Sequence, residues 1–150
     1  MSWLRKVLAV KIVLVFIFWI LPLLLLPTGL FPELGIPTWT TAANVFLRLL
    51  GAAYLAIAIV EAWGFFNAAH RAAAVLAGLA SSAGASFVLW HDIFYGELWN
   101  WAVLGKVLIS IWLLLHGVFT IALLATGLPT LMGRPEADAT PPTAGTPHLH

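Results

Sequence analysis

The stretch from residue 43 to residue 66 reads ANVFLRLLGAAYLAIAIVEAWGFF, and its only charged residues are Arg48 and Glu61. A helix rises about 1.5 Å per residue, so roughly 20 apolar residues reach across the hydrocarbon core of a bilayer, which is about 30 Å thick. This stretch is long enough for one crossing. It therefore predicts a membrane-spanning helix and sets the class of the fold.

Three further apolar runs flank this stretch in the sequence. Together they predict helices over about residues 7–27, 43–66, 72–92 and 101–128, within a membrane domain of residues 1–130. Open strands are excluded because their edge amides would lie unpaired in lipid, and a closed barrel would show alternating segments of about 10 residues. The predicted fold class is all-α, a four-helix transmembrane bundle.

The composition agrees with a chain that is solvated by lipid. Hydrophobic residues make up 62% of the chain and charged residues 9%, against about 45–50% and about 25% in soluble domains. A net charge of +1 provides no strong field for nucleic acid, which we exclude as a partner. The absence of cysteine excludes disulfides and iron–sulfur clusters. The lipid bilayer is the predicted partner.

The first apolar run, 12–26, follows three basic residues, which is a pattern shared by signal peptides and membrane anchors. The run is longer than the usual core of a signal peptide, and apolar residues continue after it. We therefore expect a retained helix.

Basic residues outside the apolar runs predict the orientation, since lysine and arginine favour cytoplasmic loops. These residues are Arg5, Lys6, Lys11, Arg71 and Arg134. The connections over 28–40 and 93–100 contain neither lysine nor arginine. Both termini are therefore predicted to be cytoplasmic, in a multi-pass protein of the inner (plasma) membrane.

The last segment, 133–150, is rich in proline, alanine and threonine and is predicted to be disordered. It ends with His148 and His150, which lack a third ligand and make a poor metal site. No metal site is predicted.

A polar cluster is predicted under the outer surface of the bundle, formed by Arg48, His91, Asp92 and Lys106. Asp92 and Lys106 lie at similar depth on antiparallel helices, so an ion pair between them is expected. Two interpretations remain open at this stage. The cluster is either an ion-pair network that fixes helix packing or a pocket for an anionic headgroup, a quinone or a small polar ligand.

Glu61 and the histidines are the other polar groups of interest. Glu61 is interpreted as a carboxylate near the interface that reaches water, His70 or Arg71, with a proton relay as the alternative. His91 and His116 would lie roughly 13 Å apart along the membrane normal. That separation argues against one haem held by both, and we expect His116 to be hydrogen-bonded within the bundle.

The stretch FLRLLGAAYLAIAIVEAWGFFN, with Arg48, Leu49, Gly51 and Tyr54, resembles small bacterial inner-membrane proteins of the DoxX-like and BphX-like kind. Some DoxX-type proteins are subunits of quinone-linked sulfur oxidoreductases. The resemblance implies that association as one expectation for this chain, and it implies no functional residue.

No phosphate loop, nucleophile elbow or HExxH pattern occurs, so no enzyme activity is predicted. We expect a non-catalytic accessory subunit or a lipid- or quinone-binding protein, with a quinone or an anionic lipid as the bound molecule and no other cofactor. The alternative is a small transporter or a subunit of a quinone-linked redox complex. Faces of small residues on the helices favour a homo-oligomer or docking to a larger membrane complex.

Overall fold

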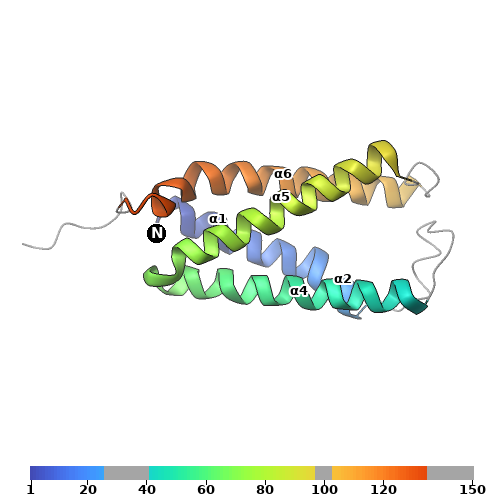
Figure 1. Cartoon of the computed structure of the whole chain (residues 1–150), viewed down its shortest axis with the longest axis horizontal. Coiled ribbons are helices and arrows are strands. Elements are labelled where there is room, and N and C mark those ends of the chain that lie inside the picture. The colour runs from blue at the N-terminus through green and yellow to red at the C-terminus, as the bar shows by residue number, and fades with distance from the viewer. Residues whose placement is uncertain (26–40, 97–102, 135–150) are drawn as a thin grey trace, which may run out of the picture.

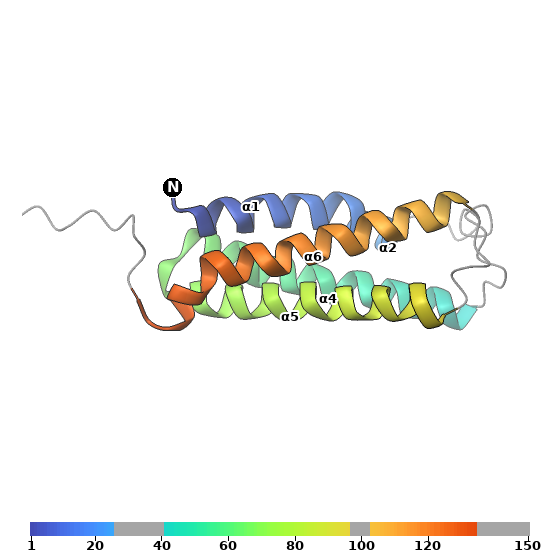
Figure 2. The ribbon, with the colours of Figure 1, turned by 90° about the horizontal axis from the view of Figure 1, so that it is seen from above.

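The computed structural model describes residues 1–25, 41–96 and 103–134, with the side chains of residues 41–44 left aside. Almost all of these residues are in helices, and none of them is in a strand. The four long helical segments form rods that lie side by side, each antiparallel to the next along the chain (Figure 1, Figure 2). The predicted all-α class is thus confirmed for the described residues, while the predicted tail lies outside them from position 135 onward.

The first rod contains three consecutive segments. Helix α1 covers Trp3–Val15, a π-helical turn (η1) covers Phe16–Ile20, and helix α2 covers Leu21–Leu25. The hydroxyl oxygen of Ser2 accepts a hydrogen bond from the backbone N–H of Arg5, which caps the start of α1. This cap explains why the rod begins at residue 3 rather than near the predicted residue 7.

The π-helical turn lies just before Pro22, which has no backbone N–H to donate to the preceding turn. The backbone N–H of Leu21 reaches back five residues to Phe16, as in a π-helix. This wider turn changes which side chains face inward. Trp19 and its neighbour Ile20 are both buried, whereas Phe18 is exposed.

The other three rods are nearly continuous helices. Helix α4 covers Thr41–Phe66 and is followed by a short 3-10 turn, η2, over Ala68–His70. Helix α5 covers Arg71–Tyr95 and α6 covers Val103–Leu131. Asn67 is extended and its side chain caps η2, so α4 and α5 are joined by a tight connection over residues 67–70.

Each rod is long and apolar enough to cross a membrane. The candidate spans are Trp3–Leu25, Val45–Phe66, Ala68–Tyr95 and Val103–Leu131. Large apolar side chains also point outward on all four rods, among them Val10, Phe46, Phe87 and Ile121. Apolar surface of this extent is unfavourable in water but suits contact with lipid tails. The fold is therefore that of a multi-pass membrane protein.

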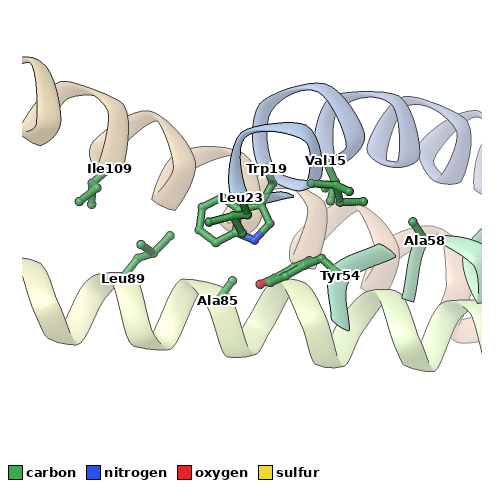
Figure 3. Packing of buried hydrophobic residues seen from close by; sticks show 9 residues of the cluster. Val15, Trp19, Leu23, Tyr54, Ala58, Ala85, Leu89 and Ile109 are labelled. Atoms are coloured by element: carbon green, nitrogen blue, oxygen red, sulfur yellow. The ribbon is translucent and has the colours of Figure 1, made fainter. Parts of the chain in front are cut away.

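Two apolar clusters make up the core of the bundle. One lies near the N-terminal end and consists of Leu4, Leu8, Ala74, Val75 and Leu123. The other lies further along the bundle and consists of Val15, Trp19, Ile20, Leu23, Tyr54, Ala58, Ala85, Leu89 and Ile109 (Figure 3). Buried polar side chains separate the two clusters along the helices, and these polar groups are the starting point for the functional site.

Candidate ligand site

A buried ion pair links α1 to α4. The ammonium group of Lys11 donates a hydrogen bond to the carboxylate oxygen Oε1 of Glu61, and each side chain is only 1% exposed. Lys11 Nζ also donates to Ser81 Oγ on α5 at 3.2 Å, and Ser81 Oγ donates to the carbonyl oxygen of Gly78 at 3.1 Å. The pair thus joins three helices, and hydrogen bonds accompany the charges as burial requires.

This contact corrects two predictions from the sequence. Lys11 was expected among the basic residues of the cytoplasmic flank, and Glu61 was expected to reach water, His70 or Arg71. Both expectations are wrong, because α1 already begins at Trp3 and Lys11 lies about two turns inside it. At that depth no water is available to a lone charge, so the two opposite charges pair.

Gly78 provides the space for the Glu61 carboxylate. A Cβ atom at position 78 would lie 3.2 Å from Glu61 Oε1 and 2.8 Å from Leu123 Cδ1. The missing side chain lets α4 and α6 both approach α5 at this level. A small residue therefore holds the charged pair against the helix backbone.

Aromatic side chains from three rods meet about two turns beyond the ion pair. The Trp19 ring makes edge contacts with Tyr54 at 5.4 Å, Trp112 at 4.5 Å and His116 at 5.5 Å between ring centroids. The ring centroids of Tyr54 and His116 lie 6.2 Å apart. Edge-to-face packing of this kind fixes ring orientations, so Trp19 is held between α4 and α6.

His116 is 4% exposed, and its Nδ1 atom is buried without a hydrogen-bond partner. The expected hydrogen bond of the imidazole is therefore absent from the described part of the chain, although the Thr120 hydroxyl does donate to the backbone carbonyl of His116 at 2.8 Å. Within the described residues, no three histidine, aspartate or glutamate side chains are grouped as metal ligands. The ring packs as an aromatic side chain beside Trp19.

A cavity of about 510 Å³ lies beside this aromatic cluster, within the range of about 300–1,000 Å³ for small-molecule sites. All four rods contribute to its walls, through residues that include Trp19, Leu23, Leu47, Tyr54, Ala85, Leu89, Ile109 and Trp112. Ser81 lines one end and Asp92 lines the other. Along α5 these two residues are separated by about 16 Å, so the cavity is elongated along the bundle.

The cavity opens sideways between α4 and α5. The two helices are packed tightly next to their connection, where a Cβ atom at Gly64 would lie 2.2 Å from Ala74 Cβ, and they diverge towards the opposite end of the bundle (Figure 1). The cavity-lining residues of these helices include exposed positions on both sides, namely Leu50, Ala53, Gly84 and Val88. The opening therefore faces the surface that lipid would cover.

The structure does not gather the four predicted site residues into one cluster. Asp92 lines the cavity and lies 3.7 Å from His91 Nδ1, and both side chains are about half exposed. Arg48 Nη1 instead donates to the carbonyl oxygen of Leu23 at 2.8 Å, which caps the last turn of α2. In the described part of the chain no ion pair joins Asp92 to Lys106, which is in the first turn of α6 and half-buried.

Sequence reasoning missed the residues that form the interior of the site. Lys11 was assigned to the flank, and Trp19 and Tyr54 were given no role at the site. One signal was present, because Leu4, Leu8 and Lys11 recur at the spacing of one helix face. That spacing would have placed Lys11 on the face of α1 that enters the bundle.

These features define a class of protein, a bundle of four candidate membrane-spanning helices with an internal ion pair and a laterally open apolar cavity. Comparison of the chain with protein-family models, with curated proteins and with solved structures found no match.

Proposed function

We propose that the protein binds a largely apolar molecule of the bilayer, a lipid or an isoprenoid quinone, in the cavity between its helices, and that it catalyses no reaction itself. The observation that carries this proposal is the cavity of about 510 Å³ with its opening between α4 and α5. Its lining is almost entirely apolar, so a molecule that already dissolves in the membrane can move into it without losing hydrogen bonds to water.

The kinship with DoxX-like and BphX-like proteins remains a prediction, and so does membership of a larger membrane complex. A quinone would satisfy both the chemistry of the cavity and that kinship. An accessory subunit that holds a quinone or lipid beside a partner would need the lateral opening and no catalytic groups, which agrees with the lining residues.

Filling the cavity tests the proposal. Gly84 lines it, and a Cβ atom built at this position has no other atom within 4 Å, so Gly84→Leu adds volume to the cavity without a clash. We expect this variant to bind decylubiquinone or a fluorescent phospholipid about tenfold more weakly than the unaltered protein, a change of about 1.4 kcal/mol. Equilibrium titration in detergent micelles measures the affinity.

Gly117→Leu provides the matched control, because its Cβ atom would also meet nothing within 4 Å and Gly117 does not line the cavity. We expect this variant to bind both probes with the affinity of the unaltered protein. If both leucine variants bind equally well, the cavity is not the binding site and the proposal fails.

We further propose that the bundle lies in the inner membrane with its N-terminal end in the cytoplasm. Arg5 and Lys6 lie at this end, together with the connection between α4 and α5 that leads into Arg71 (Figure 1). Lys11 is buried in the bundle and is left out of this argument on orientation.

The absence of cysteine makes this orientation testable with single-cysteine variants. Ala68 and Tyr95 are exposed at opposite ends of α5 and its preceding turn. In intact cells, a membrane-impermeant maleimide should label Tyr95→Cys but not Ala68→Cys, and inside-out vesicles should show the reverse. Labelling of Ala68→Cys in intact cells would invert the proposed orientation.

A small transporter is the second candidate, and one observation favours it. Transport needs polar groups at depth within the bundle, and Lys11 and Glu61 supply them next to Ser81, which lines one end of the cavity. Exchange of a bound radiolabelled lipid between the two leaflets of proteoliposomes distinguishes the candidates, since a binding protein would not accelerate it.

A further inference from the structure

The Tyr54 hydroxyl is a hydrogen-bond donor at the cavity without a partner among the described residues. The indole N–H of Trp19 beside it makes no hydrogen bond to the described residues either, but its nitrogen atom is covered by protein atoms and does not face the cavity. Both side chains are 8% exposed and both line the cavity. Polar groups inside folded proteins are nearly always hydrogen-bonded, so the unpartnered Tyr54 hydroxyl points to an acceptor supplied from outside the chain.

The direction of the Tyr54 hydroxyl is fixed by its neighbours. Figure 3 shows the phenol oxygen of Tyr54 turned towards α5 near Ala85. The rings of Tyr54 and Trp19 are 5.4 Å apart in an edge contact, and Trp112 and His116 hold Trp19 from the other sides. The Tyr54 ring packs against Trp19 and His116, so its hydroxyl is set in position before a ligand arrives, which reduces the entropy lost on binding.

The charges around this region favour a neutral acceptor. Lys11 is neutralised by Glu61 and also donates to Ser81, so its charge is not available to an anionic guest. The single charged residue lining the cavity, among those described, is Asp92, which would repel a carboxylate or phosphate at the rim. A carbonyl oxygen has the required acceptor strength without a charge.

We infer that the ligand inserts head first and that its head is a neutral carbonyl group, whose oxygen accepts a hydrogen bond from the Tyr54 hydroxyl while its apolar tail extends through the opening between α4 and α5. This inference rests on the proposed function and specifies the chemistry of the ligand. It excludes the carboxylate of a fatty acid and the headgroup of a phospholipid as the group that binds beside Tyr54. The head of the ligand then lies beside Tyr54 inside the bundle, and not at the Asp92 end of the cavity.

A matched pair of probes tests the inference. One is an alkylated 2-acylnaphthalene, and the other is the corresponding alkylnaphthalene without the carbonyl. We expect the unaltered protein to prefer the carbonyl probe by about threefold to tenfold, as for one net hydrogen bond. The carbonyl stretching band of the bound probe should also move to lower frequency, which packing alone would not produce.

Tyr54→Phe removes one donor and keeps the ring, and Tyr95→Phe on the exposed end of α5 is its control. We expect Tyr54→Phe to lose most of the preference and most of the infrared shift while binding the hydrocarbon unchanged, and Tyr95→Phe to change neither. Equal affinity for the two probes, with no infrared shift, would overturn the head-first inference and leave the proposed function standing. If neither probe binds, the proposed function itself fails.

Discussion

Replacement of Lys11 with methionine is expected to lower the free energy of unfolding by about 3–5 kcal/mol. The change leaves the Glu61 carboxylate buried at 1% exposure without its counter-ion, and it also removes the hydrogen bond to Ser81. Thermal or denaturant unfolding in detergent, followed by circular dichroism, measures the loss.

Lys6→Met is the control on the same helix. Lys6 is exposed and its ammonium lies over the Trp3 ring, so its removal should cost no more than about 1 kcal/mol.

The double variant Lys11→Met/Glu61→Leu shows whether the loss of stability comes from the unpaired Glu61 carboxylate or from the absence of the whole ion pair. Replacement of a whole buried ion pair by apolar side chains is often neutral or stabilising. We therefore expect the double variant to be more stable than Lys11→Met alone, and close to the unaltered protein. Equal stability of Lys11→Met and Lys6→Met would contradict the buried pair.

Replacement of Gly64 with alanine is expected to destabilise the bundle by about 1–3 kcal/mol, although alanine is the better helix former. The new methyl group would lie 2.2 Å from Ala74 Cβ and 3.0 Å from the carbonyl oxygen of His70. Neither atom can move without its backbone, so α4 and α5 would have to move apart at this contact. The same unfolding measurement applies.

A reciprocal change should recover part of this loss. In Gly64→Ala/Ala74→Gly the methyl group is moved from α5 to α4. This removes the 2.2 Å contact between the two Cβ atoms and leaves the 3.0 Å approach to the carbonyl oxygen of His70. Ala74→Gly alone should cost about 1 kcal/mol through its helix propensity, and yet it should stabilise the Gly64→Ala background. Gly117→Ala meets nothing within 4 Å and should not destabilise. Additive effects of the two changes would contradict the contact.

Much of the candidate site could not be predicted from the sequence. In a soluble helix, polar and apolar faces show which side is buried. In a membrane helix the lipid-facing surface is as apolar as the core, and here Phe18 is exposed while Trp19 beside it is buried. The apolar residues alone therefore do not show how each helix is rotated about its axis.

The polar residues near the helix ends were also over-interpreted. Arg48, His91, Asp92 and Lys106 lie at similar depth, and depth alone suggested a cluster. A charged side chain close to a helix end can reach solvent or a free carbonyl instead, as Arg48 does at Leu23. Of the four, Asp92 alone contributes to the cavity wall.

The sequence by itself determined the four apolar helices and their all-α class, because a segment in lipid must satisfy its backbone hydrogen bonds internally and long apolar runs do so only as helices. Only the tertiary structure decided which side chains meet. The π-helical turn before Pro22 directs Trp19 inward, and Gly78 admits Glu61 to Lys11. The divergence of α4 from α5 leaves the cavity open towards lipid. These contacts depend on helix rotation and separation, which arise from packing between segments far apart in the chain and not from local hydropathy.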